Sequence, residues 1–280
     1  MNIPELKTFL AIVETKQLNR AGEQLHVTQS TVTARLNKLE ETLGQTLFHR
    51  KKSGAELTSA GFRFERYAQL MVELWNQAQQ ETALPENIKN TFNLGCEAEL
   101  WPGLGETIFE QIKHSQNEVA FSSWSGDQTT LDKWLDNDLI DAAICYQPVL
   151  KANRHEYKLP DDTLVLVSTD KRNLVRWDPQ YIYVDSGEEF RKQHAIAYPD
   201  GDTPMVTFGS VIWAKEYLIK TGGSAYLPLR LIQSELENKK LHRVPDAPEF
   251  NRNIWLILKN NQTLNWQWLE PVIKETLTFL

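Results

Sequence analysis

Residues 25–50 read LHVTQSTVTARLNKLEETLGQTLFHR, and this stretch decides the fold of the amino-terminal part of the chain. Within it, apolar side chains recur at steps of three and four residues, which is the spacing of a helix packed along one side. Thr28 stands where a hydroxyl can cap the first helical amides, and Gly44 stands where a helix commonly ends. The sequence therefore predicts a helix between them, with a buried stripe of Val32, Leu36, Leu39 and Leu43.

The opposite side of this helix carries short polar side chains. At about 100° per residue, the positions opposite the stripe are Ser30, Thr31, Thr33, Ala34, Asn37 and Lys38, with Gln29 and Arg35 on the flanks. A helix that lies in the major groove of DNA needs one packed face and one face whose donors and acceptors reach base edges and phosphates. We therefore interpret this segment as a DNA recognition helix.

Two shorter helices are expected before the recognition helix. Their apolar faces are Leu6, Phe9, Leu10 and Val13 in the first, and Leu18, Ala21 and Leu25 in the second. Three short helices joined by tight turns predict a helix-turn-helix arrangement, in which a later helix enters the groove.

A basic segment, LFHRKKSGAELT at residues 47–58, follows the recognition helix. It reads as a hairpin that turns at Ser53 and Gly54, with His49–Lys52 placed to contact phosphates beside the groove. A basic quartet standing alone would be interpreted as a solvated loop. Its position directly after a helix-turn-helix pattern favours the DNA contact.

These residues together resemble the winged helix-turn-helix of the LysR-type transcriptional regulators, with LTSAG at residues 57–61 as the closing motif. Gly22 and Thr33 stand where that family usually has Ala and Ser, and Gly22 should weaken the second helix by about 1 kcal/mol. The resemblance implies that Gln29, Ser30, Thr31, Thr33 and Arg35 face DNA and that Arg50 grips the backbone. The expected DNA-binding set also includes Lys38, Lys51 and Lys52.

The charge distribution fits a DNA-binding amino-terminal part. The whole chain has a net charge of -7, but residues 1–64 hold nine Lys or Arg against six Asp or Glu, a local balance of +3. The remaining residues balance at -10. A basic head on an acidic body is compatible with a polyanionic partner for the head alone.

A long helix is expected from Thr58 to about Leu84. Its apolar residues alternate steps of three and four, the spacing of a paired-helix seam. A helix lying on its own domain would show similar spacing, but the resemblance favours dimerisation, because this family pairs through a linker helix here. The expected dimerisation residues are Phe64, Tyr67, Met71, Leu74 and Ala78. A two-fold dimer implies an inverted-repeat operator.

Residues 91–280 alternate short apolar strands with helical stretches, which predicts an α/β architecture. The candidate strands are TFNLGC, EVAFSSW, DAAICY, LVLVST, YIYVD and NIWLILK. Their order resembles the effector domain of the same family, which is similar to periplasmic binding proteins in having two lobes. We expect a winged helix-turn-helix domain at residues 1–60, a linker helix and hinge at 61–87, and an effector domain at 88–280. Lobe I would hold about 91–167 and 248–280, and lobe II about 168–247.

An effector would bind between the lobes, against the turns that follow the strands. The expected cleft residues are Glu97, Glu99, Leu100, Trp101, Trp124, Ser125, Gly126, Asp127, Thr207, Phe208, Gly209 and Ser210. Relatives that sense organic acids are expected to carry Ser or Thr at the first of these turns. The two glutamates here predict a neutral or cationic effector, because like charges repel. The alternative is that both glutamates cap helices or face solvent.

Nine tryptophans are many for this length. Aromatic rings can cage cations and flat ligands, so Trp101 and Trp124 stay cleft candidates, although most tryptophans are expected to fill the core. Cys96 and Cys145 are expected to be buried thiols. We find no phosphate loop, nucleophile elbow or metal-ligand spacing, so we expect no enzyme activity, cofactor or metal. The polar run VDSGEEFRKQH is interpreted as a solvated loop.

The sequence predicts a regulator that binds an inverted repeat in double-stranded DNA as a homodimer or homotetramer and responds to a small-molecule effector. RNA polymerase is a further expected contact. The alternative is a DNA-bending or silencing protein whose acidic domain only oligomerises. No apolar run approaches the roughly 18 residues that span a bilayer, and MNIPELKTFL lacks the pattern of an export signal. We therefore expect a cytoplasmic protein without membrane contact.

Overall fold

The computed structural model describes residues 1–51, 54–88, 90–116, 118–173, 178–199, 201, 203–259, 269, 271–273 and 275. The chain divides into two compact units, Met1–Asn87 and Ile88–Leu280. Each unit has its own buried core, and each is described by itself.

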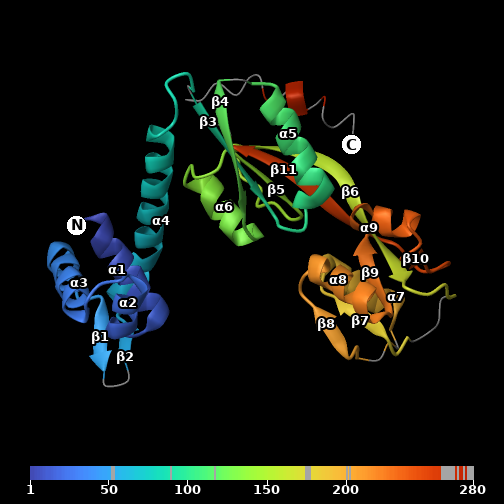
Figure 1. The fold of residues 1–280 in the computed structure, drawn as a ribbon, viewed down its shortest axis with the longest axis horizontal. Helices are drawn as coiled ribbons and strands as arrows, with labels where there is room; N and C mark the ends of the chain where they lie inside the picture. The colour runs from blue at the N-terminus through green and yellow to red at the C-terminus, as the bar shows by residue number, and fades with distance from the viewer. Residues whose placement is uncertain are drawn as a thin grey trace. The chain divides into compact units, whose positions relative to one another are not determined.

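The first unit is a winged helix-turn-helix followed by one long helix (Figure 1). The three predicted short helices and the predicted hairpin are confirmed. The elements are α1 Ile3–Thr15, α2 Leu18–Gln24, α3 Gln29–Leu43, β1 Phe48–Lys51, β2 Gly54–Leu57 and α4 Ser59–Thr82.

The caps of α3 follow from its sequence. Thr28 accepts a hydrogen bond from the backbone N–H of Thr31, and Gly44 ends the helix in the left-handed region at φ 64°. Val32, Leu36 and Leu39 are buried, as the stripe predicted. Leu43 is only partly buried, because it lies at the last turn.

The core of this unit joins all three short helices to α4. Phe9 of α1 is fully buried, and its ring contacts Phe48 of β1 and Phe64 of α4, each at a centroid distance of 5.3 Å. Burying these aromatic rings removes apolar surface from water and fixes the packing of α1 between the wing and the long helix.

The second unit is built on a curled sheet with the strand order β4-β3-β5-β11-β6-β9-β7-β8, in which β10 also pairs with β6. All six candidate strands are confirmed. The strands are β3 Asn90–Cys96, β4 Val119–Ser125, β5 Ala142–Cys145, β6 Arg154–Ser168, β7 Tyr181–Val184, β8 Val206–Phe208, β9 Ser224–Pro228, β10 His242–Arg243 and β11 Phe250–Lys259.

Helices cover this sheet in two groups (Figure 1). They are α5 Glu106–His114 and α6 Gln128–Asp136 in the first lobe, and α7 Glu188–Ala197, α8 Val211–Thr221 and α9 Leu229–Glu237 in the second. A short kinked segment, η1 Trp101–Gly105, precedes α5. The expected two-domain α/β fold is confirmed.

Two long strands connect the lobes. Leu159 of β6 and Ile254 of β11 pair in the core of the first lobe, whereas Leu164 and Phe250 pair farther along the same strands and pack in the second. Both strands continue from one lobe into the other, with a register shift between Arg252 and Ile254. They therefore connect the two lobes.

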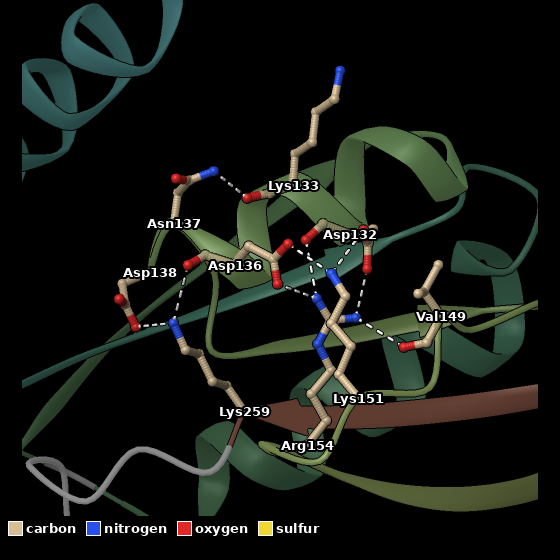
Figure 2. Close-up of polar contacts among 9 residues, drawn as sticks. All are labelled: Asp132, Lys133, Asp136, Asn137, Asp138, Val149, Lys151, Arg154 and Lys259. Carbon is tan, nitrogen blue, oxygen red and sulfur yellow. Dashed lines mark hydrogen bonds and ion pairs between the residues drawn. The ribbon is translucent and has the colours of Figure 1, made fainter. Parts of the chain in front are cut away.

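An ion cluster fastens α6 to the start of β6 (Figure 2). Arg154, whose side chain is 2 % exposed, contacts Asp132 at 2.6 Å and Asp136 at 2.8 Å. Lys151 contacts the same two carboxylates at 3.1 and 2.6 Å. Burial tends to raise the pKa of Asp136, but the hydrogen bonds and charges of Lys151 and Arg154 outweigh it and lower that pKa.

Cys96 and Cys145 are both buried and free, as expected. Burial raises the pKa of each thiol to about 12, so both remain protonated at neutral pH. Within the described part of the chain, no helix combines the length and apolar character that crossing a membrane requires.

Candidate nucleic-acid interface and effector cleft

The N-terminus of α3 presents three hydroxyl groups in one connected set. Thr28 Oγ1 lies 2.8 Å from Ser30 Oγ and 2.9 Å from Thr31 Oγ1, and it also accepts the Thr31 N–H at 3.2 Å. Gln29 and Ser30 are exposed, and Thr31 is half-buried. The first turn therefore offers hydroxyl and amide groups to a ligand while its own capping is already satisfied.

Farther along α3, the predicted DNA-binding residues differ in solvent exposure and in their ionic partners. Thr33 and Arg35 are half-buried, and Lys38 is exposed. Lys38 Nζ lies 3.5 Å from Glu5 Oε1, on a carboxylate whose side chain is 2 % exposed. Lys38 therefore has an ionic partner inside the protein, which would compete with a phosphate for its charge.

The predicted wing is an antiparallel hairpin of β1 and β2. Arg50 pairs with Ala55 and Lys51 with Gly54 in its register, whereas the side chain of Arg50 and all of Lys52 and Ser53 lie outside the described part of the chain. Lys51 Nζ donates a hydrogen bond of 2.5 Å to Glu56 Oε2. This bond and the positive charge of Lys51 lower the pKa of the Glu56 carboxyl.

Sequence reasoning missed Glu56 as the ionic partner of Lys51. In a hairpin with a two-residue turn, Lys51 and Glu56 occupy facing strands, so their spacing was a usable signal.

Three hydrogen bonds from backbone amides hold the wing to the helices. Glu40 Oε1 of α3 accepts the backbone N–H of Leu47 at 2.6 Å and that of Phe48 at 3.3 Å. On the other strand, the N–H of Ala55 donates to the carbonyl of Lys16 at 2.8 Å. Gly54 is needed here, because a Cβ at its φ of 136° would lie 2.4 Å from that carbonyl.

Gly22 in α2 has a packing reason as well. A Cβ there would lie 2.8 Å from the carbonyl oxygen of Val27, in the turn between α2 and α3. The Val27 N–H donates to the Gly22 carbonyl at 2.9 Å. Gly22 therefore lowers the stability of α2 as an isolated helix, but it lets the two backbones approach closely. An Ala at this position would disturb that contact.

The five predicted dimerisation residues separate into two groups on α4. Phe64 and Met71 are partly buried and pack against the core of their own unit, and a role for them in dimerisation stays a prediction. Tyr67, Leu74 and Ala78 are exposed. Trp75 is 46 % exposed and was not anticipated, although it follows Leu74 directly.

In the effector unit, the two glutamates at the first turn are engaged by backbone amides. Glu97 Oε1 accepts the N–H of Tyr146 at 3.1 Å, and burial raises the pKa of this carboxyl. Glu99 Oε1 accepts the N–H of Val211 at 2.9 Å, at the start of α8, where a carboxylate is favoured. Glu99 thus adopts the capping alternative that the sequence left open, whereas Glu97 binds an amide that follows β5 rather than the start of a helix.

Several other predicted cleft residues have structural roles. Leu100 is fully buried in the core of the first lobe, so it forms no cleft wall, and the partly buried Trp101 ring packs 5.7 Å from Phe109. Asp127 caps α6 by accepting the N–H of Thr130 at 2.7 Å. In each case the turn residue satisfies a helix end or fills the core, and a role of Trp101 or Asp127 in the cleft stays a prediction.

The remaining candidates lie at the ends of β4 and β8. Trp124 is 42 % exposed, and its Nε1 donates to Ser122 at 2.8 Å. Phe208 packs against the core of the second lobe, and Ser210 caps α8 by accepting the N–H of Trp213. Ser125, Thr207 and Gly209 are exposed, and Gly126 lies close to the side chains of Trp134 and Thr130.

A charged cluster that sequence reasoning missed joins the two lobes. Arg230 of α9 donates from Nε to Asp162 at 3.0 Å, from Nη2 to the carbonyl of Glu99 at 2.6 Å, and from Nη1 to that of Pro102 at 2.8 Å. Tyr146 donates to Asp162 at 2.7 Å. No local motif marks these residues, because they come from four distant segments.

Arg252 completes this cluster. Its guanidinium carbon lies 3.3 Å from the centroid of the Tyr146 ring, and its Nη1 lies 3.6 Å from Glu99 Oε2. That Nη1 is buried and has no hydrogen-bond partner among the described residues. A buried donor without an acceptor is costly, so this atom marks the point in the cluster where an added acceptor would be most favourable.

Comparison with known proteins agrees with this architecture. Residues 3–62 match the model of the bacterial regulatory helix-turn-helix protein, lysR family. The chain is 28% identical over 285 residues to the HTH-type transcriptional regulator HdfR of Yersinia pestis (strain Pestoides F), covering 96% of both proteins.

Two solved structures share the fold over nearly the whole chain. CbnR, a LysR family transcriptional regulator, is 14% identical with a TM-score of 0.73 and 99% coverage of both chains. LysG from Corynebacterium glutamicum, in a structure with bound effector Arg, is 16% identical with a TM-score of 0.53, covering 99% of this chain and 98% of that one.

Proposed function

We propose that the chain is a LysR-type transcriptional regulator, because residues 3–62 match the helix-turn-helix model of that family, and that it binds an inverted repeat in double-stranded DNA as a dimer or a dimer of dimers. In this proposal α3 enters the major groove, and Gln29, Ser30, Thr31 and Thr33 reach base edges or phosphates. Arg35, Arg50, Lys51 and Lys52 contact the backbone. Lys38 contributes less, because Glu5 already neutralises part of its charge.

The observation that carries the proposal is the connected hydroxyl set at the start of α3, held beside a wing that Glu40 fixes in place. Base reading requires side chains whose position is set before binding, since each loose side chain costs entropy on association. The cap at Thr28 and the Glu40 contacts supply that order on the two elements that would touch DNA.

Dimerisation would use the exposed stripe of α4. Tyr67, Leu74 and Ala78 lie on nearly one line of the helix, and Trp75 stands beside them. Phe64 and Met71 would support this stripe from behind, in the core of their own unit. A two-fold pairing along the stripe would present two recognition helices to two half-sites.

We further propose that a small-molecule effector binds among Glu99, Arg230 and Arg252, where the lobes meet. The Nη1 of Arg252 favours a ligand with a hydrogen-bond acceptor. Three carboxylates, Glu97, Glu99 and Asp162, surround the two guanidinium groups, so a neutral or cationic effector remains our choice. LysG with its bound Arg has the same fold.

Binding there would loosen or tighten the contacts of Arg230 and Glu99 that join the lobes, and so change the spacing of the DNA-binding units in the oligomer. The changed spacing would bend the operator. We also propose a contact with RNA polymerase and a cytoplasmic location. The alternative, a ligand-independent DNA-organising protein, is favoured by one observation: the protein's own side chains already bridge the lobes.

Footprinting of the full chain on a selected operator, with and without libraries of neutral, cationic and anionic metabolites, separates these functions. A footprint that lengthens or shortens with a neutral or cationic compound, and does so no longer in Arg252→Met, supports effector gating. An invariant footprint favours the DNA-organising alternative, and a response to anions alone contradicts the proposed effector class.

A further inference from the structure

The second lobe contains a cavity of about 400 Å³ that is separate from the cluster between the lobes. Its walls come from β6, β7, β9, α7 and the segments that flank them. A volume of this size falls in the range of small-molecule sites, which is roughly 300–1,000 Å³. None of the predicted effector-cleft residues lines it.

Five aromatic residues line the cavity: Tyr181, Tyr183, His194, Tyr198 and Tyr226. His194 of α7 is the centre of this group: its ring lies 5.8 Å from Tyr181, 5.4 Å from Tyr183, 4.9 Å from Tyr198 and 5.8 Å from Tyr226. The Tyr181 ring is stacked on the imidazole at an interplanar angle of 13°. Such walls bind flat rings by offset stacking and edge contacts.

The polar groups of these rings are arranged as pairs. The Tyr181 hydroxyl lies 2.9 Å from His194 Nε2, and the Tyr198 hydroxyl lies 2.7 Å from that of Tyr226. A phenol oxygen can donate one hydrogen bond and accept two, so the half-buried Tyr198 can bond to the fully buried Tyr226 and to a ligand group at once. The cavity therefore combines apolar walls with a small number of placed hydrogen-bonding atoms.

The charges at the cavity cancel. Arg172 Nη1 contacts Asp178 Oδ2 at 2.6 Å, and Asp178 also accepts the hydroxyl of Ser224. Burial lowers the pKa of His194, which keeps the imidazole neutral at pH 7. A charged ligand would enter this site without a free counter-charge among the lining residues that the structure describes, and desolvating it would be costly.

We propose that this cavity of the second lobe is a binding site for an uncharged aromatic compound of one or two rings that carries a hydroxyl or carbonyl group. Its ring lies against Tyr181 and Tyr183, and its oxygen hydrogen-bonds with the hydroxyl of Tyr198, which Tyr226 holds from behind. The site lies apart from Glu99, Arg230 and Arg252, so it is a second ligand site of the effector unit.

The test uses isothermal calorimetry on the full chain at pH 7 with three probes that share a phenol ring. They are 4-hydroxyacetophenone, which is uncharged, 4-hydroxybenzoate, which carries a carboxylate, and tyramine, which carries an ammonium group. We expect 4-hydroxyacetophenone to bind with 1:1 stoichiometry and at least tenfold more tightly than either charged probe. No heat of binding at millimolar probe, or tighter binding of a charged probe, overturns the proposal.

Two variants on consecutive residues of α7 locate the site. Ala195 lines the cavity and is exposed, so Ala195→Trp fills the space without removing a core contact. Ile196 is 80% exposed and does not line it, so Ile196→Trp is the matched control. We expect Ala195→Trp to weaken 4-hydroxyacetophenone binding at least tenfold and Ile196→Trp to leave it unchanged. Equal affinity in both variants places the ligand elsewhere and overturns the proposal.

Discussion

Glu40 accepts the backbone N–H of Leu47 through Oε1 at 2.6 Å, and this contact couples the recognition helix to the start of the wing. The same oxygen accepts the N–H of Phe48 at 3.3 Å. One carboxylate therefore satisfies two amides at the point where the chain leaves α3 and enters β1. The proposed DNA-binding surface depends on this coupling, because base and backbone contacts come from different elements.

Replacing Glu40 by Ala should destabilise the first unit and weaken DNA binding together. Losing hydrogen bonds to a charged group typically costs about 1.5–3 kcal/mol of unfolding free energy. Urea denaturation and gel-shift titration of the same preparation measure both effects. Glu41→Ala, at the neighbouring exposed position, is the control and should change neither. Full DNA affinity in Glu40→Ala would separate the wing from binding.

Replacing Lys51 and replacing Glu56 should change DNA binding in opposite directions. Lys51→Ala should flatten the slope of log affinity against log salt by about one charge. Glu56→Gln should instead raise affinity, because it frees Lys51 from its 2.5 Å partner. Affinities measured at several salt concentrations decide this. An unaltered slope in Lys51→Ala would remove the wing from the interface.

The stripe on α4 should control the oligomeric state. Trp75→Lys places a charge beside Leu74, and we expect the dimer dissociation constant to rise at least tenfold in sedimentation experiments. Asn76→Lys adds the same charge at the next exposed residue and should leave the dimer intact. If both variants remain dimeric, α4 does not pair through this stripe.

The ion pair of Arg230 and Asp162 should contribute to the unfolding free energy of the effector unit. Asp162 has a side chain that is 1 % exposed, and Arg230 is its ionic partner. Arg230→Met should cost about 3–5 kcal/mol, because it leaves a buried charge unpaired. The double variant Arg230→Met, Asp162→Leu should recover part of that loss in urea denaturation. A double variant no more stable than Arg230→Met would contradict the pairing.

The ion cluster of Figure 2 predicts a pH dependence of the effector unit. The folded pKa of Asp136 lies below its ordinary value of 3.8. Its contribution to stability is therefore present above about pH 3.8 and is lost as the pH falls through the lowered folded pKa. Asp136→Asn should be less stable than the parent protein above that ordinary pKa, with the difference shrinking in more acidic solution.

Tryptophan fluorescence during urea denaturation can follow this, because every tryptophan except Trp75 lies beyond residue 88. Asp138→Asn removes only an exposed contact with Lys259 and should have a smaller effect. A difference between parent and Asp136→Asn that stays constant with pH would rule out the carboxylate as its source.

The winged helix-turn-helix was predictable because its signals are local. Thr28 and Gly44 mark the ends of α3, and Val32, Leu36 and Leu39 repeat along it. The strands of the sheet were predictable for the same reason, as buried apolar runs. In α4, the same three-and-four spacing fits packing on the helix's own domain and pairing with a second helix. The sequence therefore could not tell Phe64, which packs inward, from Leu74, which is exposed.

The interior of the effector unit was not predictable in this way. Glu99 meets the amide of Val211 across 112 residues, and Arg230 meets the carbonyl of Glu99 across 131. No periodicity records such pairings, because they depend on where β6 and β11 carry the two lobes. Tyr181, His194 and Tyr226 likewise come together only through the packing of α7 on the sheet.

Base reading by α3 can be tested by selecting bound sequences from a pool of random duplex DNA with the full chain. We predict enrichment of an inverted repeat, with half-site centres separated by a whole number of helical turns, each about 10–10.5 base pairs. We also predict that the Gln29→Ala, Thr33→Ala double variant fails to enrich it, since each side chain that reads a base edge contributes about 1–3 kcal/mol of discrimination. Recovery of no common sequence, or of the same repeat by the double variant, would contradict base reading by α3.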